Sequence, residues 1–220
     1  MHWVYYFGRG LARIILFLFS NWRIKGKENV PDKGPLLIVC NHLHLGDPPI
    51  VGASIKLKSV FMAKEELFRD RWSRFWVKNF GAFPVHRGKL DREAIRQAEN
   101  WVNRGFCLIM FPEGKRSSNA QMQPAFPGSA LIASRLGIPV LPVSITGTEK
   151  FKKPSGWLSR PRVTVTIRQP FNPPLPDGKM TRAELDRLTR YIMGKIAELL
   201  PPEYHGVYAR GDDARDRKSE

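Results

Sequence analysis

The stretch VCNHLHLGDPP, residues 39–49, places a histidine and an aspartate five positions apart directly after an apolar run. Two side chains with that spacing lie about 140° apart around a helix, so they cannot meet on one. They can meet across a turn, and Gly46 between them provides the backbone freedom for one. A carboxylate that binds one imidazole nitrogen fixes the tautomer and leaves the other nitrogen to take a proton from a hydroxyl group. His42 and Asp47 are therefore a candidate general base and its orienting acid.

The same residues also fit a purely structural interpretation. Asp47 followed by Pro48 is typical of a helix N-cap with proline at the first helical position. His42 would then only satisfy the backbone of the preceding loop. Spacing alone leaves both interpretations open.

A second polar segment, FPEGKRSS at residues 111–118, has the composition of an anion-binding loop. Pro112 interrupts the preceding strand, and Gly114 permits a tight turn with exposed amides. Glu113 would hold an arginine in place or bind a hydroxyl group of a substrate. The side chains that offer donors for phosphate oxygens are those of Lys115, Arg116, Ser117 and Ser118. As an isolated loop, the segment would be an ordinary basic turn.

Alternating strands and helices are expected to position these segments. Apolar or alternating runs predict strands at residues 34–42, 58–64, 82–88, 106–111, 138–147 and 162–168. Amphipathic or capped segments predict helices at residues 65–81, 91–104, 128–137 and 181–200, besides the one that would begin at Asp47. This order predicts a single α/β domain with a largely parallel central sheet flanked by helices and preceded by an N-terminal amphipathic helix.

The polar segments fall on one edge of that predicted sheet. His42 follows one strand, His86 and Arg87 lie at the end of another, and residues 112–118 follow a third. Ligands of open α/β sheets bind at the carboxyl ends of the strands. Arg87 would add a guanidinium fork for a phosphate group.

The N-terminal segment, residues 1–22, is rich in aromatic and aliphatic residues but contains Arg9 and Arg13. A helical wheel places these arginines on one side and an apolar stripe on the other, which suits a helix that lies in a membrane interface. The alternative is a helix whose apolar side packs on its own domain. Residues 23–205 form the expected domain, and the charged segment 206–220 is expected to be a disordered tail.

The composition favours an anionic partner. The formal net charge is +16, from 36 Lys and Arg residues against 20 Asp and Glu residues. Nucleic acid, an anionic membrane surface and a phosphorylated substrate all fit this charge. The two cysteines, Cys40 and Cys107, lie apart in apolar runs, so neither a zinc site nor a disulfide framework is predicted.

Four segments together resemble the PlsC-type glycerolipid acyltransferases, a family that acylates lysophosphatidic acid. NHLHLGD is similar to the family's N-H-x-x-x-x-D block, GAFPVHR to its G-x-x-F-x-x-R block and FPEGKRS to its F-P-E-G-T-R-S block. IPVLPVSITG is similar to the proline-containing fourth block, and the four occur in the family's order over residues 34–147. Lys115 departs from the pattern because threonine is common at that position, and His44 falls on a variable position.

The resemblance implies the chemistry. His42 would be the base and Asp47 its partner in the transfer of a fatty acyl group from an acyl thioester to the hydroxyl group of lysophosphatidic acid, giving phosphatidic acid. The acyl donor would be acyl-CoA or acyl-acyl carrier protein, and no metal or other cofactor is expected. The substrate-binding residues implied by the blocks are Arg87, Glu113, Gly114, Lys115, Arg116 and Ser117.

The resemblance also bears on location and on the alternatives. The resemblance implies a lysophospholipid as substrate. The N-terminal segment departs from the family because it offers one interfacial helix and no clear spanning segment, which favours peripheral attachment to an anionic membrane surface, on the cytoplasmic face. Glycerol-3-phosphate or another lysolipid is an alternative acceptor. A basic nucleic-acid-binding protein is the rival from another class, but it leaves the four ordered blocks unexplained, so no specific nucleic acid is expected.

Overall fold

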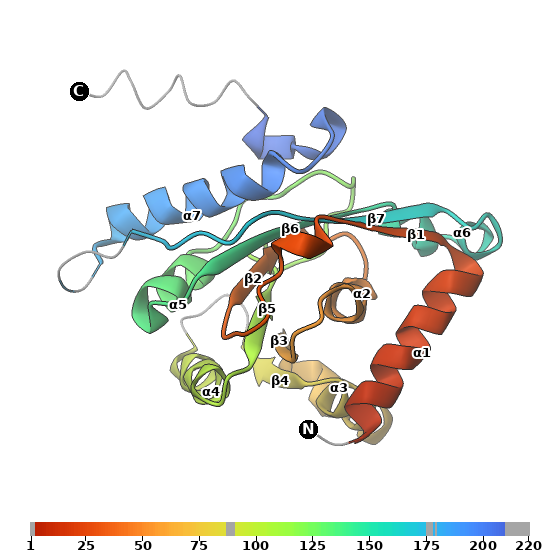
Figure 1. Cartoon of the computed structure of the whole chain (residues 1–220), viewed down its shortest axis with the longest axis horizontal. Coiled ribbons are helices and arrows are strands. Elements are labelled where there is room, and N and C mark those ends of the chain that lie inside the picture. Colours follow the sequence, from red (N-terminus) through yellow and green to blue (C-terminus); the bar gives the residue numbers. More distant parts are fainter. Residues whose placement is uncertain (1–2, 87–90, 175–177, 179, 210–220) are drawn as a thin grey trace.

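The chain folds around one seven-stranded sheet with the strand order β1-β7-β6-β2-β5-β3-β4 (Figure 1). The computed structural model describes residues 3–86, 91–174, 178 and 180–209. The strands are β1 (Asn21–Lys25), β2 (Leu37–Cys40), β3 (Ser59–Lys64), β4 (Ala82–Val85), β5 (Cys107–Met110), β6 (Val140–Thr146) and β7 (Arg162–Ile167). The α-helices are α1 (Trp3–Phe19), α2 (Asp47–Ser54), α3 (Arg71–Asn79), α4 (Arg92–Asn103), α5 (Gly128–Leu136), α6 (Pro154–Leu158) and α7 (Arg182–Ala197).

The sheet is largely parallel, as the alternation of elements predicted. β2 pairs in parallel with both β5 and β6, and β3 pairs in parallel with β4 and β5. Only the pairing of β6 with β7 is antiparallel among the named strands, while β1 runs parallel to β7 at the edge. The carboxyl ends of β2, β3, β4, β5 and β6 therefore share one edge of the sheet, called here the carboxyl edge, and His42 follows β2 there.

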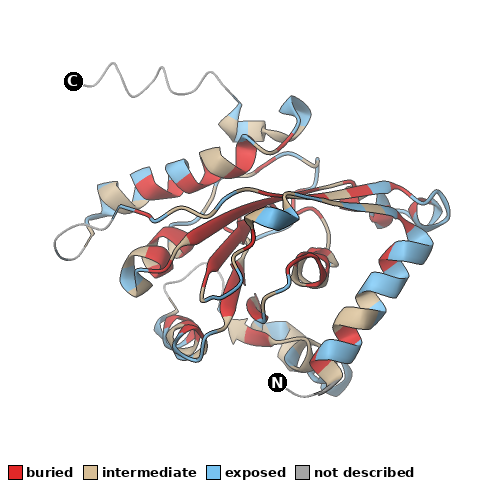
Figure 2. Ribbon diagram, in the orientation of Figure 1, coloured by how far each residue is buried: buried red, intermediate tan, exposed pale blue. Residues whose placement is uncertain are grey.

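Helices cover both faces of the sheet, and the residues of β2 alternate between the two layers. Ile38 and Cys40 pack into a core with α1 and α2, while Leu37 and Val39 pack into a core with α4, α5 and α7. All four side chains are fully buried, which explains why this strand is an uninterrupted apolar run. Figure 2 shows the central strands and α2 buried, whereas α1 is mostly exposed.

Several predicted element ends are confirmed by their capping residues. Asp91 caps α4 by accepting a hydrogen bond from the Ala94 amide, and Gly105 beyond its end has a left-handed φ of +80°. The Thr181 and Glu184 side chains form the reciprocal capping box at the start of α7.

One helix and one edge strand differ from the sequence predictions. The helix expected at residues 65–81 is split into a 3₁₀ turn, η2 (Glu65–Phe68), and α3, because the Asp70 side chain accepts the Ser73 amide and starts a new helix. The edge strand β1 was not predicted. It alternates, with Trp22 and Ile24 against the core, but a run of five residues is too short for its period to stand out.

The expected domain limits also change. The N-terminal helix ends at Phe19, and the sheet begins at Asn21 within the segment assigned to the helix. After α7 come two 3₁₀ turns, η4 (Pro202–Tyr204) and η5 (Gly206–Tyr208), and the Tyr208 hydroxyl accepts a hydrogen bond from the Ala125 amide. Residues 206–209 are therefore part of the fold and not of a tail, and residues 210–220 lie outside the described residues.

Helix α1 directs the guanidinium groups of its two arginines to α2 and turns most of its apolar side outward. Tyr5 and Leu16 are buried, and the guanidinium groups of Arg9 and Arg13 bind backbone carbonyls at the end of α2. The exposed side carries Phe7, Leu11, Ile14, Ile15, Phe17, Leu18 and Phe19, with Phe17 at 73% exposure. The alternative in which the apolar side packs on the domain is therefore wrong. No helix in the described part of the chain is long and apolar enough to cross a membrane.

Candidate active site

His42 and Asp47 form a hydrogen-bonded pair at the carboxyl edge. The imidazole Nδ1 lies 2.8 Å from Asp47 Oδ2, across the turn that Gly46 helps to form. The His42 side chain is 6% exposed and that of Asp47 is fully buried. Phe111, whose ring centroid lies 4.3 Å from that of the imidazole, supports the histidine from one side. The pairing engages Nδ1 and leaves Nε2 as the ring atom that can face a substrate.

The interpretation of Asp47 as a helix cap is wrong. Helix α2 begins at Asp47 itself, and no side chain caps its first turn. Asp47 Oδ2 instead accepts hydrogen bonds from the backbone amides of Leu43 and His44, at 2.6 and 2.7 Å, in addition to its contact with the imidazole. The carboxylate thus points back into the His42–Asp47 loop and fixes both the loop and the imidazole.

Asn41 anchors the end of β2 just before the histidine. Its side-chain amide donates to the Ile145 carbonyl at 2.9 Å, and its side-chain oxygen accepts from the Ile145 amide at 2.8 Å. This residue bridges β2 to β6 where the backbone of β2 leaves the sheet. The sequence signal for this bridging residue was its position immediately before His42.

Glu113 lies in the site with its carboxylate turned toward the protein backbone. Oε1 accepts a hydrogen bond from the His42 amide at 2.9 Å, and Oε2 accepts one from the Gln123 amide at 2.8 Å. Burial raises the pKa of this carboxyl group from its ordinary 4.5 to about 7, and the two amides oppose that change. Glu113 is completely buried, so its carboxylate ties the residue that carries the imidazole to the neighbouring loop.

The remaining residues of the 111–118 loop divide into two groups. Lys115 and Arg116 are exposed at the edge, as an anion-binding loop requires. Gly114 forms the turn with φ +64°, where a Cβ atom would lie 2.9 Å from the Phe126 ring, and its amide donates to the Phe111 carbonyl. Ser117 is buried, with its amide bonded to the His42 carbonyl and its hydroxyl to Asn119. Of the four donors expected in this loop, Lys115, Arg116 and Ser118 are exposed and Ser117 is buried.

Further positive charge at this edge comes from residues that the sequence analysis did not single out. Lys152, in the 3₁₀ turn η3 (Thr148–Lys152) after β6, donates to the Ser117 carbonyl at 2.7 Å. Lys64 ends β3, the strand beside β5, and pairs with Glu66 at 2.9 Å. Lys64 lies at the carboxyl end of a strand and Lys152 in the turn after one, and these positions were the sequence signal that could have identified them.

His44 and His86 are both placed near this edge but have different surroundings. His44 Nδ1 accepts the Gly46 amide, and burial is the main cause that lowers its pKa, opposed by Asp47. His86, at the end of β4, contacts Asp91 at 2.9 Å and Glu65 at 2.5 Å, which raises its pKa. Arg87, predicted to grip a phosphate group, lies outside the described residues.

No cluster of three or more histidine, cysteine, aspartate or glutamate side chains that could hold a metal ion occurs among the described residues. The buried carboxylates of the edge are instead committed to backbone amides and to the imidazole. The arrangement offers a histidine supported by a carboxylate, beside exposed cations.

Comparison with known proteins places this fold and site in a class. The model of the family described as Acyltransferase matches residues 21–146. A 1-acyl-sn-glycerol-3-phosphate acyltransferase of Streptococcus pneumoniae is 32% identical over 172 residues, which span 76% of this chain and 62% of that protein. Its counterpart in Bacillus subtilis is 30% identical, over 68% of this chain and 77% of that protein.

A solved structure agrees with these matches. The 1-acyl-sn-glycerophosphate (LPA) acyltransferase PlsC from Thermotoga maritima aligns with a TM-score of 0.64 and 29% identity, covering 89% of this chain and 78% of that one. The class is thus an α/β acyltransferase domain. The chain belongs to the Acyltransferase family, as its four sequence blocks predicted.

Proposed function

We propose that this protein transfers a fatty acyl group from an acyl thioester to the free hydroxyl group of lysophosphatidic acid, giving phosphatidic acid. The names of the relatives, 1-acyl-sn-glycerol-3-phosphate acyltransferases, support this acceptor. The observation that carries the proposal is the hydrogen bond of 2.8 Å between His42 Nδ1 and Asp47 Oδ2, which orients a base at the end of β2.

The proposed reaction is a direct transfer. His42 Nε2 removes the proton of the acceptor hydroxyl, whose oxygen attacks the thioester carbonyl carbon. The tetrahedral intermediate collapses as the carbon–sulfur bond breaks, and the imidazolium can return the proton to the thiolate that leaves. Asp47 stabilises the transient imidazolium without taking its proton. The reaction written this way needs no metal ion and no covalent acyl-enzyme.

Glu113 has a positioning role in this proposal and does not bind the substrate. Its carboxylate accepts the amides of His42 and Gln123, so it orients the base through the backbone. Gly114 and Ser117 shape the same loop, because the turn at Gly114 leaves no room for a side chain and Ser117 is bonded to His42 and Asn119.

The phosphate group of the acceptor is assigned to the exposed cations. Lys115 and Arg116 project from the loop after β5, and Lys152 lies beside them through its hydrogen bond to the Ser117 carbonyl. Arg87 completes this set from its position in the second sequence block, outside the described residues. Guanidinium and ammonium groups bind phosphate oxygens through charge-assisted hydrogen bonds.

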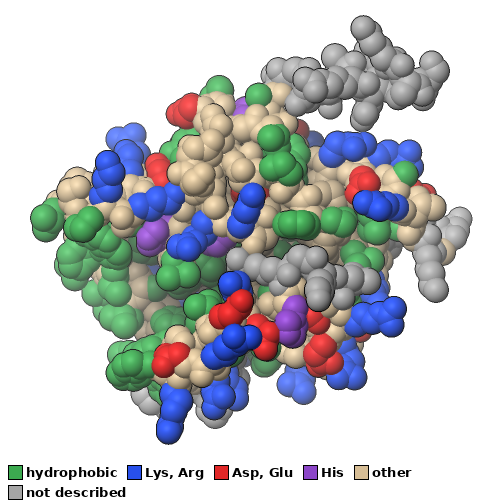
Figure 3. All heavy atoms as spheres, turned by 180° about the vertical axis from the view of Figure 1, so that it is seen from behind, with side chains coloured by type: hydrophobic (Ala, Val, Ile, Leu, Met, Phe, Trp, Pro, Cys, Tyr) green, Lys and Arg blue, Asp and Glu red, His purple; other side chains and the backbone are tan. Residues whose placement is uncertain are grey.

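The acceptor would reach the site from an anionic membrane surface on which the exposed side of α1 rests. An aromatic series connects that helix to the site, since Phe19 contacts Trp157, Trp157 contacts Phe151, and Phe151 contacts His44, with centroid separations of 5.9, 4.6 and 6.0 Å. Hydrophobic side chains gather at the left of Figure 3, on the side where α1 lies, next to Lys and Arg side chains. Such a surface suits peripheral attachment to acidic lipids.

The acyl donor is proposed to be a thioester of coenzyme A or of acyl carrier protein, which would meet the protein on the cytoplasmic face. Glycerol-3-phosphate and other lysolipids remain alternative acceptors, because the exposed cations would also bind their phosphate groups.

The test is the release of free thiol from palmitoyl-CoA with one acceptor added at a time. Lysophosphatidic acid, glycerol-3-phosphate and lysophosphatidylcholine form the panel, and His42→Ala is the blank. We expect thiol release that depends on lysophosphatidic acid and product that co-migrates with phosphatidic acid. Thiol release that no acceptor stimulates would remove the transferase assignment. Salt-sensitive RNA binding would not support the rival function, because any protein of charge +16 can bind RNA in that way.

A further inference from the structure

The membrane-facing helix α1 is hydrogen-bonded to the helix that begins with Asp47. Arg13 Nε and Nη2 donate to the Ala53 carbonyl at 3.1 and 2.9 Å. One turn earlier on α1, Arg9 Nη2 donates to the Ile55 carbonyl, and its Nη1 lies 3.5 Å from the Lys56 carbonyl. Both arginines of α1 therefore bind the carboxyl end of α2.

The carboxyl end of α2 needs these partners. The last carbonyls of a helix have no donors within the helix, and a left-handed glycine often supplies one. Here the residue after α2 is Ile55, with an extended backbone, so no glycine cap forms. The two guanidinium groups take its place, and their charge is favourable at the negative end of the helix. Arg9 is half-buried in this contact, and that burial lowers its pKa.

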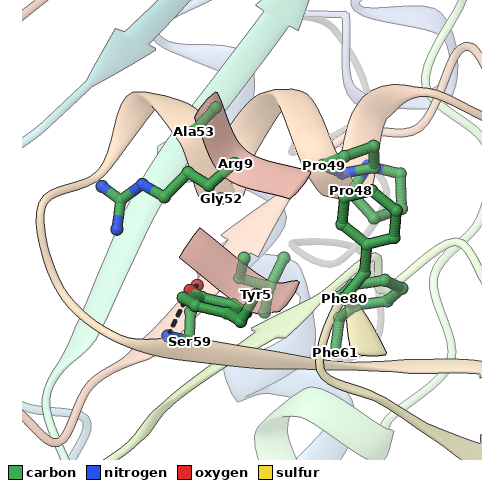
Figure 4. Close-up of a pocket in the computed structure, with 10 residues that line it drawn as sticks. Tyr5, Arg9, Pro48, Pro49, Gly52, Ala53, Ser59, Phe61 and Phe80 are labelled. Carbon is green, nitrogen blue, oxygen red and sulfur yellow. Dashed lines mark hydrogen bonds between the residues drawn. The ribbon is translucent and has the colours of Figure 1, made fainter. Parts of the chain in front are cut away.

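Helix α2 is short and depends on its ends. It has eight residues, or about 12 Å, and α1 is the element against which it packs most. A small cavity lies between α2, α1 and β3 (Figure 4), and its lining includes Tyr5, Arg9, Pro48, Ala53, Ser59 and Phe80. The inner side of α2 is buried in the core, and hydrogen bonds add to this packing at both of its ends, through Asp47 at the start and the two arginines at the finish.

We propose that Arg9 and Arg13 are positioning residues for the His42–Asp47 pair. They hold α2 on α1, and α2 in turn holds Asp47 against the imidazole and the loop amides. The two sides of α1 then have separate tasks, because the outer side contacts lipid and the inner side fixes the catalytic helix. This inference rests on the proposed function and adds to it that α1 supports catalysis as well as attachment.

The test compares variants on the two sides of α1. Arg13→Ala and Arg9→Ala remove the inner contacts, and Leu18→Ser reduces only the outer apolar side. Arg23→Ala is the matched control, since it removes an exposed arginine of β1 with the same change of charge. Each variant is measured by thermal unfolding, by binding to vesicles of phosphatidylglycerol and phosphatidylcholine, and by turnover with detergent-dispersed substrate.

Arg13→Ala is expected to lower kcat by about 10- to 100-fold, with the KM of each substrate nearly unchanged and vesicle binding retained. The acidic limb of its kcat profile should move to lower pH, because a displaced carboxylate stabilises the imidazolium less. Leu18→Ser should lose vesicle binding and keep the wild-type kcat with detergent-dispersed substrate. Arg23→Ala should keep wild-type turnover.

Hydrogen exchange at the Leu43 and His44 amides, both bonded to Asp47, follows the positioning without any substrate. In Arg13→Ala these amide hydrogens should exchange about tenfold faster than in the wild type. In Leu18→Ser and Arg23→Ala they should exchange at the wild-type rate. If Arg13→Ala does not fold, Arg13→Lys decides, since a lysine can make only part of the contact.

Wild-type amide protection and kcat in the folded Arg13 variants would overturn the inference. If Arg13→Ala exchanged these amides faster but the wild-type protein transferred no acyl group, only the proposed function would be refuted.

Discussion

The carboxylate of Glu113 accepts the backbone amide of His42 at 2.9 Å, although 71 positions separate the two residues in the chain. This contact joins the loop after β5 to the loop after β2, and Ser117 joins them again by donating its amide to the His42 carbonyl. The backbone of the proposed base is therefore fixed on both sides by the segment that also presents Lys115 and Arg116. The proposed base and the proposed phosphate-binding cations therefore lie on two loops that hydrogen bonds join into one unit.

Replacement of His42 should abolish transfer, whereas replacement of His44 should leave most of it. Only His42 has its Nδ1 on Asp47; His44 Nδ1 accepts the Gly46 amide. His42→Ala is expected to lose about 10² to 10⁴ in kcat, the usual contribution of a general base. Steady-state kinetics of both alanine variants test this. An inactive His44→Ala beside an active His42→Ala would show that the pair is wrongly assigned.

Asp47→Asn should lose turnover while remaining folded. Asparagine keeps an oxygen that can accept the Leu43 and His44 amides, but it lacks the charge that stabilises an imidazolium. We expect kcat to fall by about 10² or more and the free energy of unfolding to fall by only about 1 to 2 kcal/mol, as charged acceptors become neutral. Asp47→Ala is the comparison, since it removes the acceptor as well. Wild-type kcat in Asp47→Asn would make the carboxylate purely structural.

Glu113 should make the stability of the protein depend on pH. Its pKa is raised by burial from 4.5 to about 7, so the folded state holds this proton more tightly than the unfolded state does. The resulting stabilisation is present below about pH 4.5 and is lost as the pH rises through about 7, on the order of 3 kcal/mol in total. Glu113→Gln, which cannot ionise, should show a smaller decline over that range.

Urea unfolding at several pH values measures this difference. The sign is the informative part, since a carboxylate whose pKa was lowered would instead add stability as the pH rises. Parallel curves for wild type and Glu113→Gln between pH 5 and 7 would mean that the folded state does not retain the proton. Because Glu113 faces the His42 backbone and not solvent, we also expect Glu113→Gln to lower kcat more than it raises the KM of the acceptor.

Arg116→Ala should weaken the binding of the acceptor and leave proton removal by His42 intact. A phosphate group that does not itself react is bound equally in the ground state and the transition state, so its loss raises KM more than it lowers kcat. The expected change is about 1.5 to 3 kcal/mol in the binding of the acceptor, with the KM of the acyl donor nearly unchanged. Arg87→Ala is expected to behave in the same way. Arg116→Lys should recover only part of the loss, because an ammonium lacks the guanidinium fork.

Kinetics with varied lysophosphatidic acid and varied palmitoyl-CoA separate the two substrates. If Arg116→Ala raised only the KM of palmitoyl-CoA, the arginine would serve the phosphates of the donor. A loss of kcat with intact acceptor affinity would place Arg116 at the reacting groups instead.

The sequence by itself determined most of the alternation of strands and helices after β1, and that the loops with His42 and Glu113 meet at one edge of the sheet. Continuous apolar runs such as Leu37–Cys40 specify strands that are buried on both faces, and the Thr181 and Glu184 capping box specifies the start of α7. These signals are local, because a period or a cap is complete within one segment. Parallel strands then bring the loops after β2 and β5 to one edge, whatever the details of packing.

Only the tertiary structure decided which way the polar side chains point. The sequence offered Asp47 as a cap or as a partner of His42, and Glu113 as a ligand for substrate, but amides from distant loops determine what each carboxylate accepts. The helical wheel of α1 separated an apolar side from the arginines, yet it did not show that the arginines face inward. That orientation depends on the carbonyls at the end of α2 that accept the arginine hydrogen bonds. No local pattern in α1 contains these partners, because they lie 40 or more positions further along the chain and are brought to α1 only by folding.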